Sequence, residues 1–237
     1  MASYLTEWME QCMFTTIPGD NYAENVYNAI VNDIVNSSLS EGEKLSDKEL
    51  AQRFGYSRTP IREALIMLER DGFVKTVGRE GTYVRRLTQS NIRDIYVVRE
   101  ALETIAARLG AVGVSDDDLM MMDSVLLRME EIIRRGEDSG ANDFVWLDLE
   151  FHQLIVRSSG VKLLGEICHN LGLLSASIHC RGTQYAQQLT TYAEQHRAIY
   201  QAFANHNAVD AENLLREHIQ YGKMMLLLGG GPGLQSK

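Results

Sequence analysis

The chain has 237 residues, 45% of them hydrophobic, and a formal net charge of −9. This composition is normal for a folded globular protein with room for one large or two modest domains, and the overall charge gives no sign of nucleic-acid binding. No stretch approaches the roughly 18 consecutive apolar residues of a membrane span, and the N-terminus lacks the features of a signal peptide. Three cysteines without metal-type spacing favour reduced thiols, so we expect a cytoplasmic protein with no membrane partner.

The charge is distributed unevenly along the chain. Residues 53–86 contain eight arginine or lysine residues against four aspartate or glutamate residues, a local charge of +4. A basic segment in an otherwise acidic chain predicts two parts with different partners. We therefore expect an N-terminal domain over residues 21–87 and a second domain over residues 88–228.

The N-terminal part has the pattern of short helices joined by tight turns. After an N-terminal extension, residues 1–20, which suits either a flexible leader or a docked helix, helical spacing predicts a first helix over 21–38. Ser46 predicts the start of a second helix, with Glu49 completing a capping box, and the glycine at position 55 ends it. A third helix follows at once, so the pair forms a helix-turn-helix.

The third helix carries the residues that we expect to contact DNA. Ser57 is placed to cap it, and Pro60 is tolerated in its first turn because the missing N–H has no partner there. Arg58, Thr59 and Arg62 lie near its start, where they can reach base edges or phosphates. On spacing alone, an ordinary amphipathic helix with solvated arginines is an equally good interpretation.

The helical spacing of apolar residues ends after this helix. Residues 73–77 and 82–85 are β-prone runs that flank a turn containing two glycines, which predicts a hairpin. A helix-turn-helix followed by a hairpin is a winged helix, and Arg79 lies at the predicted wing tip.

Residues 88–228 are predicted to be helical throughout. Candidate helices cover 89–112, 115–136, 141–158, 161–180, 185–206 and 208–227, with short breaks between them. Short loops predict an antiparallel bundle of six to seven helices. The fold class is therefore mainly α, with a small β-hairpin wing, and the glycine-rich tail, residues 229–237, is expected to be disordered.

Polar residues interrupt the apolar faces of three bundle helices. Asp148 and His152, four residues apart, share the face of their helix with apolar residues, while His196 and His218 do the same on two later helices. Three imidazoles and a carboxylate match the ligand set of a divalent ion such as Zn, Ni, Mn or Fe. For any single histidine, a hydrogen-bonded core residue is the commoner explanation, but their coincidence favours a metal site.

Arg99 is the corresponding residue of the first bundle helix, on an apolar stripe formed by Ile95, Val98, Leu102 and Leu109. A guanidinium group buried beside a metal can bind an effector carboxylate with two hydrogen bonds. The other histidines, at positions 169, 179 and 206, fall off the stripes or at a helix end, so we expect them on the surface or in helix caps.

Several segments of the first domain form a motif set: Asp47-Lys48-Glu49-Leu50-Ala51, Tyr56-Ser57-Arg58-Thr59-Pro60-Ile61-Arg62-Glu63-Ala64-Leu65, Leu68-Glu69-Arg70-Asp71-Gly72-Phe73-Val74 and Arg79-Glu80-Gly81-Thr82-Tyr83-Val84. They resemble the winged helix of GntR-family repressors. The segment Tyr96-Val97-Val98-Arg99-Glu100-Ala101-Leu102-Glu103 looks like the entry to the FCD ligand domain of the FadR subfamily.

This resemblance implies a bacterial homodimer that binds a palindromic DNA operator and responds to a small carboxylate effector. By motif position it places DNA contacts at Lys48, Ser57, Arg58, Thr59, Arg62, Arg79 and Gly81. Many FCD domains bind a metal through an Asp, a His four residues later and two further His, which here are Asp148, His152, His196 and His218. Two alternatives remain: a metalloenzyme whose open metal position activates water, and a polar cluster that is purely structural.

Overall fold

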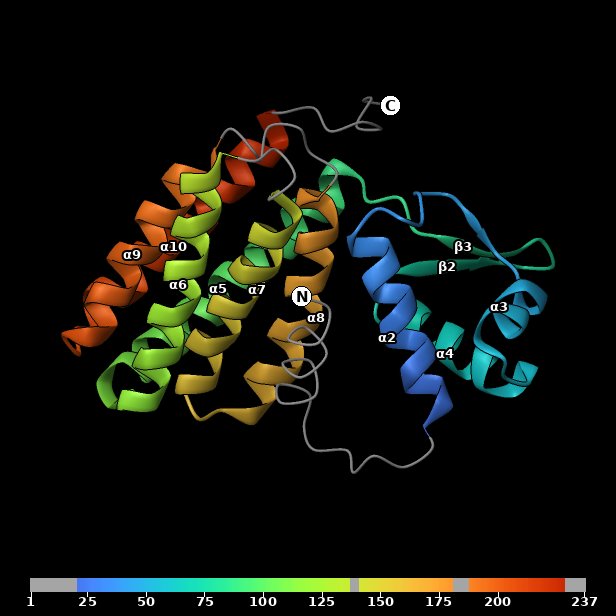
Figure 1. Ribbon diagram of the computed structural model, residues 1–237, viewed down its shortest axis with the longest axis horizontal. Helices are drawn as coiled ribbons and strands as arrows, with labels where there is room; N and C mark the ends of the chain where they lie inside the picture. Colours follow the sequence, from blue (N-terminus) through green and yellow to red (C-terminus); the bar gives the residue numbers. More distant parts are fainter. Residues whose placement is uncertain (1–20, 137–140, 181–187, 229–237) are drawn as a thin grey trace.

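The computed structural model describes residues 21–136, 141–180 and 188–228. The predicted N-terminal extension (1–20) and tail (229–237) lie outside these residues. In Figure 1 a small N-terminal part, coloured blue to teal, lies beside a larger bundle of helices, coloured green to red. The fold is mainly α with a small antiparallel sheet, as the sequence predicts.

The N-terminal part is a winged helix-turn-helix. Its helices are α2 (Tyr22–Val35), α3 (Asp47–Phe54) and α4 (Arg58–Arg70), and its strands are β1 (Lys44–Leu45), β2 (Val74–Val77) and β3 (Gly81–Val84). The predicted hairpin is β2–β3, and β1 adds a third antiparallel strand, so that the sheet order is β1-β3-β2. Buried Val26, Ile30, Ile61 and Leu68 form part of the core that holds α4 against α2.

The cap of α4 differs from the prediction. Ser57 occupies the N-cap position with extended backbone, but its side chain makes no capping hydrogen bond. The third helical position, from which a capping hydroxyl usually receives an N–H, is Pro60, which has no N–H. Ser46, by contrast, caps α3 by accepting from Glu49 N at 3.4 Å. The Ser57 hydroxyl is thus available for another partner.

The bundle consists of the six helices α5 (Gln89–Gly113), α6 (Asp116–Arg135), α7 (Ala141–Ser158), α8 (Lys162–His179), α9 (Leu189–Ala204) and α10 (Ala208–Leu228) within the part of the chain described. The long α5 packs against α7, α8, α9 and α10. Its approach to α7 is close: a Cβ on Gly110 would lie 2.1 Å from Ser158 Oγ and 3.1 Å from the backbone carbon of Ser158. None of the described helices is long and apolar enough to cross a membrane.

The buried face of α5 is not the predicted apolar stripe. Val98 is 42% exposed and Leu109 is 50% exposed, so only part of that stripe is buried. The buried side carries Ile92, Ile95 and Tyr96 in its first part. Beyond Tyr96 it carries only polar or small residues: Arg99, Glu103, Thr104, Ala106, Ala107, Gly110 and Ala111. The prediction was wrong because neighbouring helices approach small side chains closely, whereas the polar side chains are satisfied by partners that periodicity does not reveal.

Helix α8 is the bundle helix next to the winged helix: it packs against α5 and α7 within the bundle and against α2 of the N-terminal part (Figure 1). Leu174 Cδ1 lies 3.8 Å from the position that a Cβ on Gly72 would take, just after α4. A second link runs from α7 to the end of α2, where Trp146 Nε1 donates to Asn36 Oδ1 at 3.0 Å. The side chains of α7 and α8 therefore touch both parts of the molecule.

Candidate nucleic-acid interface and candidate metal centre

The start of α4 presents its polar side chains to solvent. Arg58 and Thr59 are exposed in the first turn, directly after exposed Ser57. Arg62, with 64% of its side chain exposed, donates from Nε to Asp47 Oδ2 at 2.8 Å, which joins α4 to the start of α3. Exposed Lys48 follows Asp47. The structure thus gathers the predicted contact residues of α3 and α4 on one accessible surface.

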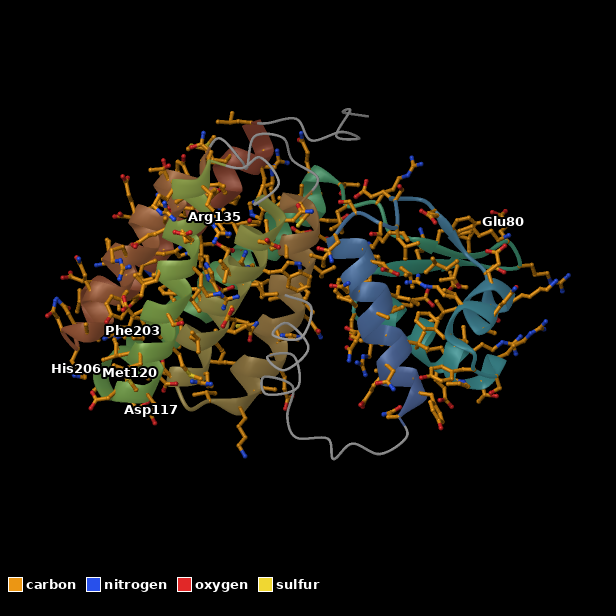
Figure 2. All side chains as sticks on the ribbon, in the orientation of Figure 1. Glu80, Asp117, Met120, Arg135, Phe203 and His206 are labelled. Atoms are coloured by element: carbon orange, nitrogen blue, oxygen red, sulfur yellow. The ribbon has the colours of Figure 1, made fainter. Side chains whose placement is uncertain are left out.

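The wing is the second element that we expect to contact DNA. Arg79 is exposed in the turn between β2 and β3, next to Glu80, which Figure 2 labels on the N-terminal part, away from the bundle. Gly81 has a φ of +126°, and a Cβ there would lie 2.8 Å from Lys44 Cε. Since this backbone conformation is unfavourable for residues with a side chain, Gly81 fixes the path of the wing beside Lys44.

The predicted metal ligands meet inside the bundle, where α7, α9 and α10 face one another. One ligand atom from each of Asp148, His152, His196 and His218 lies within 4.8 Å of the others. His152 Nε2 is 3.1 Å from His218 Nε2, and Asp148 Oδ1 is 3.2 Å from His196 Nε2 and 3.9 Å from His218 Nε2. All three imidazoles are buried.

The hydrogen bonds of two imidazoles fix which nitrogen carries the proton. His152 Nδ1 lies 2.5 Å from Glu103 Oε2, and His218 Nδ1 lies 2.9 Å from Gln195 Oε1. Because these oxygens accept, each Nδ1 donates, and the Nε2 lone pairs of both rings point toward each other and toward a carboxylate. Such electron-rich atoms repel unless a cation lies between them.

The donor set therefore fits a divalent metal. Metal–ligand bonds of about 2.0–2.2 Å place neighbouring ligand atoms of one ion roughly 3 Å apart, close to the separations of 3.1 and 3.2 Å found here. Glu103 and Gln195 orient the two rings in the way that carboxylates and amides behind metal-bound histidines commonly do. The residues present thus suit an ion bound through nitrogen and one carboxylate.

A polar network extends from His152 along α5 and α8. Arg99 Nε donates to Glu103 Oε1 at 2.7 Å, and Arg99 Nη1 donates to Ser175 Oγ at 2.7 Å. The Tyr96 hydroxyl lies 3.0 Å from Ser175 Oγ and 2.7 Å from His179 Nε2. Arg99 is thus buried beside the cluster as predicted, but it is already paired.

Burial and neighbouring charges shift the pKa values of this network. Burial raises the pKa of Glu103, but the Arg99 charge and the bonds to Arg99 and His152 outweigh it and bring the pKa to about 2. Burial likewise opposes ionisation of Asp148, and the bond to His196 and the surrounding imidazoles hold its pKa below the ordinary value. Burial lowers the pKa of His196, of His218 and, to about 4, of His179. Burial therefore favours the neutral form of the His196 and His218 imidazoles, which is the form that binds metals.

The residues that support the ligands were not predicted from the sequence. Glu103 lies one turn after Arg99 on the same side of α5, a spacing that could have revealed the pair. His179 was expected on the surface or in a cap, and this was wrong: it is buried, because α8 is covered by neighbours on several sides. His206 is exposed, and its Nδ1 lies 3.2 Å from the Ala111 carbonyl near the end of α5.

Comparison with known proteins identifies both parts. Residues 22–84 match the family model described as bacterial regulatory proteins, gntR family, and residues 94–221 match the FCD domain. The HTH-type transcriptional regulator YdhC of Bacillus subtilis is 29% identical, covering 84% of this chain and 88% of its own. The HTH-type transcriptional repressor RspR of Escherichia coli is 26% identical, covering 83% and 85%. Escherichia coli McbR/YncC, a solved structure with 20% identity, has the same fold, with a TM-score of 0.76 over 87% of this chain and 97% of that one.

A winged helix joined to a helical bundle with a buried polar cluster defines a DNA-binding transcription regulator rather than an enzyme, and the relatives are regulators of this class. The chain belongs to the GntR family and carries an FCD domain.

Proposed function

We propose that this protein is a ligand-responsive repressor of the FadR subfamily, which binds a palindromic operator as a homodimer. In this proposal residues 21–87 form the DNA-binding domain and residues 88–228 form the effector domain. The contacts to DNA come from Lys48, Ser57, Arg58, Thr59, Arg62, Arg79 and Gly81. Operator binding in a bacterium places the protein in the cytoplasm.

The observation that carries the proposal is the exposed start of α4. Arg58 and Thr59 are exposed and, within the described residues, Arg58 forms no salt bridge. The Ser57 hydroxyl, which does not cap the helix, is available to a phosphate. In a winged helix the recognition helix enters the major groove with its N-terminal residues at the base edges. We assign this role to α4 and a backbone contact to the wing.

The buried cluster is the proposed effector site. Asp148, His152, His196 and His218 would hold a divalent ion (Zn, Ni, Mn or Fe), which would supply an open position for the carboxylate of a small effector. Arg99 Nη1, now 2.7 Å from Ser175 Oγ, is the donor that we assign to that carboxylate. The effector changes DNA binding only through its different affinities for the two arrangements of the DNA-binding domains.

The exposed side of α5 supports the proposed homodimer. Val98, Ile105, Leu109 and Val112 are 42%, 51%, 50% and 67% exposed, and half-buried Leu102 completes a series with alternating spacings of four and three residues. This spacing forms one straight apolar stripe on a helix and is the seam along which two helices pack. We assign the stripe to the same stripe of a second copy, related by a two-fold axis.

The dimer is tested by a charge on the stripe. Leu109→Glu places a carboxylate in the seam, and we expect the protein to sediment as a monomer at concentrations where the wild type is a dimer. Val97→Glu is the matched control, because Val97 is 59% exposed on the same helix but off the stripe. Monomer formation by both variants, or by neither, would count against this seam.

The function is tested by selecting a duplex from a random DNA pool and measuring its affinity by fluorescence anisotropy. We expect the selected site to be palindromic and the metal-loaded protein to release it when a carboxylate effector is added. Removal of the metal with a chelator should abolish this response while specific binding remains. A protein that binds no duplex specifically would refute the repressor assignment, and turnover of an added acid would favour the metalloenzyme.

A further inference from the structure

Glu103 is a buried carboxylate next to the proposed effector site that the four-residue ligand set does not include. Its Oε1 accepts from Arg99 Nε at 2.7 Å, and its Oε2 lies 2.5 Å from His152 Nδ1 and 3.4 Å from Arg99 Nη2. The side chains of Arg99 and Glu103 are 6% and 2% exposed. A buried ion pair of this kind costs desolvation, so its charge balance matters to whatever binds beside it.

The charges around the site can be counted. Among the described residues, the acidic and basic side chains in contact with the ligand imidazoles or with one another at this site are Asp148, Glu103 and Arg99. The positive charge of Arg99 is offset by Glu103 within hydrogen-bond distance. Imidazoles that coordinate a metal are neutral, so Asp148 would leave a bound divalent ion with one uncompensated positive charge.

The other acidic residue near Arg99 on α5 does not enter this count. Glu100 Oε1 accepts from Gln220 Nε2 at 3.0 Å, on the outer side of α5. It also lies near two cations, 3.8 Å from Arg216 Nε and 4.0 Å from Lys223 Nζ. Its charge is therefore offset by α10 at the rim of the bundle.

We infer that Glu103 sets the charge of the effector site, so that the metal-loaded site selects an acid with one carboxylate over the same acid with two. This inference rests on the proposed function and names the class of its effector. Without Glu103, the guanidinium of Arg99 would add a second positive charge and suit a dicarboxylate. With it, Arg99 keeps its hydrogen-bond donors but contributes no net charge, and the second carboxylate of a diacid would be desolvated without a counter-charge.

The test compares matched acids that differ by one carboxylate: glycolate with hydroxymalonate, and D-gluconate with D-glucarate. Affinities are measured by calorimetry on the full-length, zinc-loaded protein. We expect the wild type to favour the monoacid of each pair. In Glu103→Gln the ratio of affinities should shift toward the diacid by roughly tenfold or more, since unit charges about 12 Å apart interact this strongly at an effective dielectric constant near 20. Glutamine keeps an oxygen that can accept from His152 Nδ1, and elemental analysis checks that zinc is retained.

Two further variants separate charge from local damage. Arg99→Gln with Glu103→Gln removes both charges, so the ratio should return to the wild-type value although both acids bind more weakly. Glu100→Gln removes the same formal charge one turn earlier on α5 and should leave the ratio unchanged. If Glu103→Gln loses zinc, Arg99→Gln alone carries the test: it should weaken the diacid more than the monoacid.

The results that would overturn the inference are specific. A wild type that prefers the diacids, or a Glu103→Gln variant that binds zinc and keeps the wild-type ratio, contradicts it while leaving the effector site in place. A Glu100→Gln variant that shifts the ratio as far as Glu103→Gln contradicts it too. If none of the four acids binds to any zinc-loaded variant, the proposed carboxylate site itself fails, which is a different result from acids that bind without discrimination.

Discussion

The start of α4 and the polar cluster of the bundle are both rich in charged and polar groups. At the start of α4 these groups are exposed to solvent, whereas in the cluster they are enclosed by the helices of the bundle. Arg58 and Arg79 are exposed and, in the part of the chain described, form no salt bridge, whereas Arg99, Glu103 and Asp148 are enclosed and each has a partner. An exposed arginine stays hydrated until a phosphate arrives, so folding costs it no desolvation. A buried charge must be offset inside the fold, which limits the cluster to small ligands of defined charge.

The largest expected effect concerns the buried polar cluster of the bundle. His196→Ala removes a fully buried ligand atom, and we expect metal affinity to fall by more than about 100-fold, since even residues behind the ligands contribute 10- to 100-fold. The measurement is metal content after dialysis against a weak chelator. The helical signal of the winged helix should persist. His206→Ala, which removes an exposed histidine of the bundle, is the control, and full occupancy in His196→Ala would refute the ligand set.

The role of the exposed start of α4 in operator binding is tested by Arg58→Ala. If Arg58 contacts a base edge, its loss should weaken operator binding by about 1–3 kcal/mol, measured as the anisotropy of a labelled duplex. Thermal unfolding should be unchanged, because Arg58 is exposed. Arg128→Ala removes the same charge from α6, where Arg128 is paired with Glu150, and should leave operator affinity intact. Equal affinities for wild type and Arg58→Ala would contradict the role of α4.

The close packing that positions the cluster is tested at Gly110. Gly110→Ala puts a methyl group against Ser158, and we expect the free energy of unfolding to fall by about 1–3 kcal/mol, the usual cost of overpacking. Gly113→Ala is matched to it on the same helix, since a Cβ there meets nothing within 4 Å. Gly113→Ala should raise the free energy of unfolding by up to about 1 kcal/mol. Equal melting temperatures for the two variants would mean that α5 and α7 are not packed closely here.

The smallest expected effects concern two serines, Ser46 and Ser57, which both occupy the N-cap position of a helix. Ser46→Ala removes a capping bond from α3 and should lower the free energy of unfolding by about 1 kcal/mol. Ser57→Ala removes no capping bond, so unfolding should be unchanged, while operator affinity falls by about 1 kcal/mol through the loss of one hydrogen bond. The measurements are chemical denaturation and anisotropy on both variants. A destabilised Ser57→Ala protein would show that the hydroxyl caps α4 after all.

Much of the fold could be predicted because the relevant signals are local. Helical periodicity placed the bundle helices, and the glycines around the wing marked the hairpin that became β2–β3. The candidate metal ligands were also predictable, since Asp148 and His152 lie one turn apart on an apolar face where an unpaired polar group would be costly. The orientation of α5 was not predictable in this way, because most of its apolar stripe faces outward and its buried side beyond Tyr96 is small or polar.

By itself, the sequence determined the order of the elements, the family to which the chain belongs and the four residues of the cluster, because each depends on spacing along one segment. Only the tertiary structure decided that Glu103 orients His152, that Arg99 donates to Ser175, and that Ser175 and His179 of α8 join Tyr96 in the same network. These contacts connect residues 49 to 83 positions apart. The physical reason is that the partner of a buried charge is chosen by how helices pack, and packing brings together side chains that no local pattern relates.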